Sequence, residues 1–335
     1  MCPSSVPASP AGITTDWLSA LVGGVISWST TEIGFEYGLS GSTHRIDLEL
    51  LGGASKSVVV KLAPATPTRR EITFFEACAH RTPLPLPGFI DGATDRGADR
   101  GVVVLDYLQG TRRGDVLEGC TEAEAHTLAG MLARLHAAWW NDDDPGLRSL
   151  EDLGDDRVGV VPHIREGRLG IFLDRFDELA DRTIRPWIEG LEDRAAALHH
   201  ALGAGPTTLI HADYHLDNVL FLGSREPFII DWQQATAGPP EVDVARFLVE
   251  CLTTDQRSRY GPAALSTYVE GLGTAGIAPA ADFEGRVLGA LELLLPGIIN
   301  WLGRPEPDPP ESRKAALGRN MLLNTMAAIA DFAPS

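Results

Sequence analysis

Apolar and polar residues alternate along residues 30–62, which is the pattern of β-strands that bury one face. It predicts three antiparallel strands joined by tight turns, at 31–37, 43–50 and 56–62. From Thr68 apolar residues recur at helical spacing, so a helix should follow the third strand directly. The prolines of residues 82–88 exclude a helix there, because proline lacks an amide donor.

A hairpin is predicted next, with its turn at 91–101 and its second strand at 102–108. The chain up to Leu105 should therefore form a five-stranded antiparallel sheet with one helix. After Gly110 strand patterns nearly vanish. Thr121 and Glu124 form a capping box ahead of a long helix. Further helices are predicted at 171–202, 241–253, 258–272, 284–301 and 312–332.

These patterns predict an α+β fold of two lobes, a small five-stranded β lobe with one helix and a large, mainly helical lobe. We expect the small lobe at 1–105, a hinge at 106–110 and the large lobe at 111–335. Two short β-rich pieces, 207–214 and 227–232, enclose the most polar segment of the large lobe.

Composition excludes several classes of protein. Hydrophobic residues make up 44% and charged residues 22%, which is typical of a globular chain and excludes a wholly disordered or fibrous one. The formal charge of −18, from 28 basic and 46 acidic residues, repels phosphate backbones and anionic lipid. We therefore expect no nucleic-acid partner and no membrane docking. The four cysteines show no paired spacing, which argues against disulfides and a zinc cluster.

No segment of the sequence reads as a targeting signal or a membrane span. The first dozen residues lack both a basic cluster and an apolar run. The longest apolar stretch, 287–303, is interrupted by Glu292 and Pro296 and falls short of a spanning helix. We expect a soluble, cytoplasmic protein that is a monomer or a weak homodimer.

The strongest chemical signal is a cluster of polar residues in the 209–233 segment. Asp213 follows His211 by two residues, Asn218 comes five residues later, and Asp231 ends an apolar strand. Phosphoryl transfer from a nucleotide needs such parts, because the protein mainly orients the acceptor and holds metal ions. Asp213 would orient the acceptor hydroxyl or accept its proton. Asn218 and Asp231 offer hard oxygen ligands that suit Mg²⁺.

A second signal lies in the small lobe, where Lys61 ends an apolar strand. A buried ammonium is costly unless phosphates and a carboxylate surround it. Glu71 is the preferred partner and Glu76 the competing one. The turn before the second strand offers Gly38, Gly41, Ser42 and Thr43 to phosphates, although it is not a complete glycine-rich motif.

Together these motifs resemble those of the protein-kinase-like fold over about residues 30–255. The segments 132–140, 230–233 and 238–248 are similar to those of the aminoglycoside phosphotransferase and choline kinase group, including its ecdysteroid-kinase-like branch. The resemblance implies ATP between the lobes, with its adenine against the backbone from Asp106 to Leu108. It also implies transfer of the γ-phosphate, with Mg²⁺, to a hydroxyl of a small molecule such as an aminoglycoside-like antibiotic or a choline-like or sterol-like alcohol.

The resemblance further implies roles for the residues around Asp213. His211 would brace the catalytic loop, and Asp243 would anchor it from the following helix. His215 and Asp217 would face the acceptor, whereas His136 is expected to be packed or hydrogen-bonded. Ala212 stands where the aminoglycoside kinases commonly have glycine, and Trp232 stands in place of phenylalanine. The incomplete glycine turn leaves GTP use open.

Two other functions remain as alternatives. A catalytically silent pseudokinase would not need Lys61, Asp213, Asn218 and Asp231 together. A protein kinase or fructosamine-type kinase is disfavoured because eleven residues separate Asp231 from Asp243, too few for a regulated activation loop.

Acceptor specificity is expected in the insertion at 141–205 and at the helix that ends near Trp301. The candidate residues are Asp142 to Asp144, His163, Arg165, Asp174, Asn300 and Trp301.

Overall fold

The small lobe is a five-stranded antiparallel sheet in the order β1-β2-β3-β5-β4, as the computed structural model shows. The structure describes residues 6–34, 41–151, 164–176, 185–188 and 190–333. The strands of this sheet are β1 Val25–Ile33, β2 Ser42–Leu50, β3 Ser55–Ala63, β4 Phe89–Asp95 and β5 Arg100–Asp106. Five antiparallel strands were predicted, and this part of the fold is confirmed.

Two edge strands differ from the prediction. The first strand is Val25–Ile33 rather than 31–37, and β4 extends through Asp95 where a turn was expected. Both strands carry mostly polar, exposed or half-buried residues, so their pairing is held by backbone hydrogen bonds that no apolar pattern reveals. Helix α1, Thr15–Val22, was also not predicted, so the small lobe holds two α-helices rather than one.

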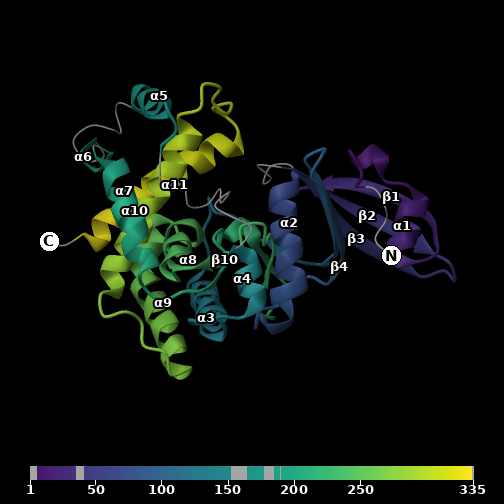
Figure 1. Ribbon diagram of the computed structural model, residues 1–335, viewed down its shortest axis with the longest axis horizontal. Helices are drawn as coiled ribbons and strands as arrows, with labels where there is room; N and C mark the ends of the chain where they lie inside the picture. The colour runs from purple at the N-terminus through teal and green to yellow at the C-terminus, as the bar shows by residue number, and fades with distance from the viewer. Residues whose placement is uncertain (1–5, 35–40, 152–163, 177–184, 189, 334–335) are drawn as a thin grey trace.

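Both faces of the sheet are covered. Trp17 and Leu18 of α1 pack with Val58 and Val60 of β3 on one face. Helix α2, Ala65–Thr73, lies on the other face, between the sheet and the large lobe (Figure 1). The run of apolar residues in β5 is therefore buried on both sides.

The large lobe is mainly helical, as predicted (Figure 1). Its helices are α3 Glu122–Ala138, α4 Pro145–Glu151, α5 Arg168–Arg175, α6 Arg185–Ile188, α7 Leu191–Gly203, α8 Glu241–Arg246, α9 Thr254–Thr274, α10 Phe283–Leu302 and α11 Arg313–Phe332. Its short strands are β6 Arg112–Arg113, β7 Thr208–Ile210, β8 Val219–Phe221, β9 Phe228–Ile229 and β10 Thr236–Gly238. The predicted capping box is present, with Thr121 and Glu124 bonded to each other's backbone amides. The predicted hinge, 106–110, runs from the last residue of β5 to shortly before the start of β6, and it stays a prediction.

Helix α10 is the one helix within the described residues that is long and apolar enough to cross a membrane, and 61% of that stretch is buried inside the protein. It carries Glu292, which pairs with Arg194 of α7 at 3.2 Å. Burial of this kind is typical of a core helix.

The two lobes share one apolar core. Phe74 and Phe75 follow α2 in a π-helical turn, Phe74–Cys78, and pack together with Leu105 of the sheet and Trp232 of the large lobe. The rings of Phe74 and Trp232 are stacked, with centroids 3.9 Å apart and an interplanar angle of 2°. The buried guanidinium of Arg70 donates to the carbonyls of Leu150 and Ala235 at 2.9 and 3.3 Å. Helix α2 is thus fastened to the large lobe.

Two residues near the centre of the large lobe have a left-handed backbone. Ala212 has φ of +60° and Asp231 has φ of +66°. This conformation is strained for a residue with a Cβ atom, by about 1–2 kcal/mol. The surrounding structure therefore holds Ala212 and Asp231 in a backbone conformation that these residues do not favour.

We predict that Ala212→Gly raises the free energy of unfolding by roughly 0.5–1 kcal/mol, because relief of strain exceeds the added entropy of the unfolded chain. Urea unfolding of the variant and the wild type measures the difference. The control is Ala237→Gly in β10, where φ is not positive, and this variant should be less stable than the wild type. Equal destabilisation by both changes would show that Ala212 is not strained.

Candidate active site

The polar segment forms a hairpin-like loop between β7 and β8. β7 pairs with β10, β8 pairs with β9, and a 3₁₀ turn covers Leu216–Asn218. The amide of Ile230 donates to the carbonyl of Asn218 at 3.0 Å. This bond places Asp231, the next residue, beside the end of the loop.

Asp243 anchors the start of the loop from α8. Its fully buried carboxylate accepts from the amides of His211 and Ala212, each at 2.7 Å. His136 lies 3.4 Å from the same carboxylate and 2.9 Å from the hydroxyl of Tyr268, so it is packed and hydrogen-bonded. The two bonds to Asp243 also fix Ala212 in its left-handed conformation.

His211 braces the two halves of the loop. Its Nδ1 accepts from the amide of Asp213 at 3.2 Å, so its Nε2 donates to the carbonyl of Ile230 at 3.1 Å. Burial lowers the pKa of His211, and the neighbouring carboxylates only partly oppose this. A neutral imidazole fits these two bonds, since one nitrogen accepts and the other donates.

Asp213 lies at the centre of the loop with a side chain that is 24% exposed. Its Oδ1 is 3.2 Å from Arg246, and its Oδ2 is 3.3 Å from His215 and 3.4 Å from the amide nitrogen of Asn218. Burial alone would raise the pKa of this carboxyl. His215 and Arg246 outweigh burial and hold the pKa well below its usual range, so Asp213 stays ionised at neutral pH.

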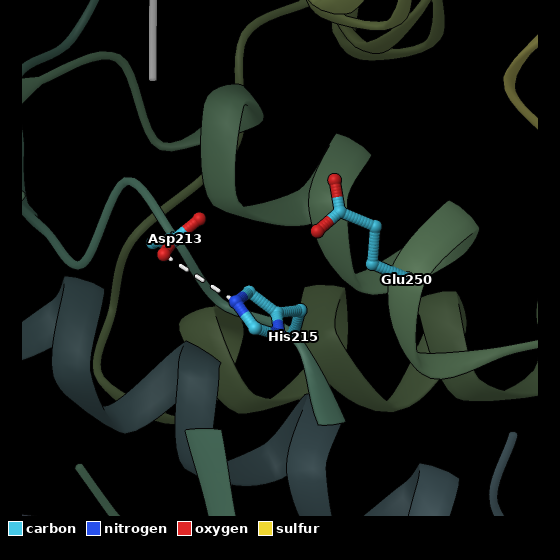
Figure 2. A group of neighbouring side chains, drawn as sticks. All are labelled: Asp213, His215 and Glu250. Carbon is cyan, nitrogen blue, oxygen red and sulfur yellow. Dashed lines mark ion pairs between the residues drawn. The ribbon is translucent and has the colours of Figure 1, made fainter. Parts of the chain in front are cut away.

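Glu250 completes a small cluster of charges with Asp213 and His215, and Figure 2 shows it reaching toward them from the neighbouring helical segment. The ligand atoms of these three residues lie within 4.8 Å of one another, as in a metal site. However, the guanidinium of Arg246 pairs with Glu250 at 2.9 Å and with Asp213 at 3.2 Å. This cation already compensates both carboxylates, so the cluster is not a suitable site for a metal ion.

Neither Arg246 nor Glu250 was predicted from the sequence as a residue of the site. Both are buried, and burial raises the pKa of Glu250 although Arg246 opposes it. The available signal was an arginine and a glutamate four residues apart within an otherwise apolar run.

Lys61 joins the two lobes at the site. Its Nζ lies 2.9 Å from Glu71 and 2.5 Å from Asp231. Burial would lower the pKa of Lys61, but the two carboxylates raise it above its usual value. Glu71, the preferred partner, is 1% exposed, and its Oε2 is the atom that contacts the Lys61 ammonium. Its competitor Glu76 does not make this contact.

The residues around Asp231 fit a divalent cation. Asp231 and Asn218 supply a carboxylate and an amide oxygen, which are ligands that Mg²⁺ accepts. Gln233 lies 3.5 Å from the second oxygen of Asp231. Its own Oε1 is buried and has no hydrogen-bond partner among the residues that the structure describes. The possible metal ligands here are therefore oxygen atoms, and one of them, Oε1 of Gln233, accepts no hydrogen bond from a described residue.

The turn ahead of β2 is described only in part, because Gly38 lies outside the described residues. A Cβ atom on Gly41 would lie 2.4 Å from the carbonyl oxygen of Leu62, so this close approach alone requires glycine. Ser42 and Thr43 begin β2, where Thr43 is paired with Lys61. Thr43 is thus placed next to the lysine on the neighbouring strand.

The predicted adenine contacts lie at the end of β5. The side chain of Asp106 pairs with Lys56 at 2.9 Å, and its amide donates to Gly88 at 2.8 Å. The amide of Tyr107 donates to Ser57 at 3.3 Å. The amide of Leu108 makes no hydrogen bond to a described residue. Of the predicted adenine contacts, Leu108 is thus the residue whose amide is without a partner among the described residues.

Asp217 does not face an acceptor, contrary to expectation. Its carboxylate accepts two hydrogen bonds from Arg313, both at 2.8 Å, and one from the amide of Val116 at 3.0 Å. A buried carboxylate with three donors has a structural role. Of the two loop residues, His215 is the one whose side chain contacts Asp213.

The candidate acceptor residues have contacts of their own. Asn300 accepts from the amide of Arg165 at 2.8 Å, and Trp301 donates to Asp308 at 2.9 Å. Asp142 and Asp144 pair with Arg81, and Asp143 and Asp174 are exposed. His163 lies outside the described residues. These contacts do not bring the candidates to Asp213.

A cavity of about 250 Å³ lies within the insertion, lined mainly by leucine and isoleucine side chains of the segment from 164 to 193. No residue of the 209–233 loop lines it. The cavity is therefore separate from the cluster of site residues.

The fold matches several solved structures. A protein from Ralstonia eutropha assigned as an aminoglycoside phosphotransferase gives a TM-score of 0.61 at 16% identity, with 95% of this chain and 98% of that chain covered. Spectinomycin phosphotransferase in complex with ADP and spectinomycin gives 0.53 at 14% identity, with 91% and 89% covered. The choline kinase of Streptococcus pneumoniae gives 0.54 at 12% identity, with 94% and 97% covered. These likenesses confirm the predicted protein-kinase-like fold.

A comparison with protein-family models assigns the chain more directly. The model described as the phosphotransferase enzyme family matches residues 42–283, which is more than half of the 335 residues. That segment includes Lys61, Glu71, Asp213, Asn218 and Asp231. A search of curated protein sequences found no match. With more than half of its length matched by that model, the chain belongs to the phosphotransferase enzyme family.

Proposed function

We propose that the protein transfers the γ-phosphate of ATP to a hydroxyl group of a small molecule, with Mg²⁺ as cofactor. The observation that carries this proposal is the pairing of Lys61 with Glu71 at 2.9 Å and with Asp231 at 2.5 Å. These contacts bring the Lys61 ammonium of the small lobe to the Asp231 carboxylate beside the loop. Such an arrangement suits the phosphates of a nucleotide bound between the lobes.

Asp213 orients the acceptor hydroxyl in this proposal. Its low pKa makes the carboxylate a weak base that is always ionised, so it holds the hydroxyl by accepting a hydrogen bond. It then takes the proton as the new oxygen–phosphorus bond forms and the bond from the γ-phosphorus to the bridging oxygen breaks, which releases ADP. At that stage the hydroxyl has become much more acidic. Arg246 and His215 keep the carboxylate in place for this role.

Asn218 and Asp231 would hold Mg²⁺. When bound, the cation neutralises negative charge on the phosphates and orients them for transfer. Lys61 is shared between Glu71 and Asp231, so a nucleotide phosphate would compete with Asp231 for the ammonium. That competition would leave the Asp231 carboxylate available to the cation.

The acceptor is proposed to be a small molecule rather than a protein. The eleven residues between Asp231 and Asp243 include β10, which pairs with β7 and leaves little exposed chain on which a peptide substrate could rest. The choline kinase and the spectinomycin phosphotransferase, both named above for their fold, are enzymes of small acceptors. We propose that the protein works in the cytoplasm as a monomer or weak homodimer.

The direct test is nucleotide turnover across a panel of acceptors. The purified protein with Mg²⁺ and either ATP or GTP is offered aminoglycosides, macrolides, choline, sugars and sterol-like alcohols. We expect ADP formation, and transfer of labelled γ-phosphate, with one class of alcohol. Transfer to a protein substrate, and to no small alcohol, would contradict the proposed acceptor. No transfer to any substrate, with ATP or GTP, would contradict the proposed phosphotransferase activity itself.

We predict that Asp213→Asn lowers kcat by at least about a hundredfold, because it removes the charge that holds the hydroxyl and accepts its proton. Nucleotide affinity should stay within about twofold of the wild type. Single-turnover rates and equilibrium binding of ATP, measured on the same preparation, separate the two effects. Near-normal turnover would exclude Asp213 as the orienting group.

We predict that Lys61→Met and Glu71→Gln each weaken catalysis and that their losses are not additive, because both changes break one ion pair. The double variant should be little worse than Lys61→Met alone in kcat/KM. Glu76→Gln is the matched control, since Glu76 follows α2 without contacting Lys61, and it should behave as the wild type. Additive losses would contradict a functional pair.

A further inference from the structure

Asp217 occupies a central place in the loop without belonging to the proposed chemistry. It directly precedes Asn218, and its side chain is 4% exposed. Its two oxygens receive the guanidinium of Arg313 in a bidentate pair, with both distances at 2.8 Å. The amide of Val116 adds a third hydrogen bond at 3.0 Å. This residue is therefore fixed on both oxygens.

Arg313 is the first residue of α11, and it reaches a second carboxylate as well. Its Nη2 lies 2.7 Å from the carboxylate of Asp115, which precedes Val116 in the segment after β6. In the same region Arg113 donates from Nε to the backbone carbonyl of Asp217 at 2.5 Å. The guanidinium of Arg313 thus connects the C-terminal helix, the loop and the segment at 113–116. We call Arg313, Asp217 and Asp115 the loop anchor.

The loop anchor bears directly on the proposed metal ligand. Asn218 follows Asp217 directly, and two hydrogen bonds hold its backbone: its amide donates to the carbonyl of His215 at 2.9 Å, and its carbonyl accepts from the amide of Ile230 at 3.0 Å. Its side-chain nitrogen in turn donates to the backbone carbonyl of Asp213 at 3.0 Å. A displacement of Asp217 would therefore move Asn218 and, through it, Asp213.

Arg313 lies outside the segment that the family model matches. The match to the phosphotransferase family ends at residue 283, thirty residues before Arg313. The loop geometry in this chain thus depends on a helix outside the matched segment. Contacts of this kind, one step away from a metal ligand, typically change metal affinity or activity by about 10–100-fold when they are removed.

We infer that Arg313 is a positioning residue that sets the orientation of Asn218 and Asp213 from the C-terminal helix. Its effect on catalysis rests on the proposed function, whereas its effect on the loop does not. Arg313 is 13% exposed and its guanidinium is engaged by two carboxylates, so its role is not to contact the nucleotide or the acceptor. It acts through Asp217.

The test compares Arg313→Lys with a matched control, Arg257→Lys. Arg257 is buried, whereas Arg313 is 13% exposed, and Arg257 holds the C-terminal half of α11 through Asp331 at 3.1 Å and through Asn324. Both changes keep the charge and remove a guanidinium that fastens α11, but only Arg313 touches the loop. Thermal unfolding verifies that both variants are folded. If Arg313→Lys does not fold, the double variant Arg313→Met/Asp217→Asn replaces it in the comparison with Arg257→Lys.

The first readout is amide hydrogen exchange of the peptide at 213–219 in the metal-free protein. We expect faster exchange there in Arg313→Lys and unchanged exchange in Arg257→Lys. The second readout is ADP affinity with Mg²⁺ and with EDTA. The ratio of ADP affinity with Mg²⁺ to ADP affinity with EDTA should fall about tenfold in Arg313→Lys, with the affinity in EDTA unchanged. In Arg257→Lys this ratio should stay as in the wild type.

The outcomes separate the two proposals. Equal effects of Arg313→Lys and Arg257→Lys on exchange at 213–219 would overturn the positioning role, because they would show a general effect of loosening α11. If the wild-type protein fails to bind ADP with Mg²⁺, the proposed function fails, and the exchange comparison alone decides the role of Arg313. Faster exchange confined to Arg313→Lys supports that role in either case.

Discussion

One ammonium group shared by two carboxylates is the interaction on which the site depends. Lys61 comes from the sheet, Glu71 from α2 and Asp231 from the large lobe, so the three groups meet only if both lobes are correctly packed. Removing Lys61 would leave the buried Glu71 carboxylate and the partly exposed Asp231 carboxylate without their shared cation, which is destabilising. The Arg70 contacts and the stack of Phe74 on Trp232 hold α2 where this pairing is possible. Packing and charge therefore impose the same arrangement of the lobes.

The loop around Asp213 is held by carboxylates that perform no chemistry. Asp243 binds two amides at its start, Asp217 binds Arg313 near its end, and Glu250 shares Arg246 with Asp213. Each of these anions has a specific donor, which is what makes their burial tolerable. The strained backbone at Ala212 persists because Asp243 holds that residue's amide.

Much of the fold and part of the site could be predicted from the sequence, because both were encoded locally. The alternating strands, the capping box and the spacing of His211, Asp213 and Asn218 are short-range patterns. Strands β1 and β4 were misplaced because edge strands with polar side chains leave no apolar pattern. Arg246 and Arg313 could not be assigned, since nothing near them in sequence shows which carboxylates they meet. The partner of Arg313, for example, lies 96 residues earlier in the chain.

The shared core has a consequence for how the chain divides. The predicted hinge at 106–110 would separate the lobes along the sequence, but Phe74, Phe75 and Leu105 pack into the same apolar cluster as Trp232. A fragment that ended at the hinge would expose that face of α2 and the sheet to water, and it would leave Lys61 without Asp231. The small lobe is thus separate in shape only. Because its apolar residues are buried against the large lobe, the two lobes should fold together as a single cooperative unit.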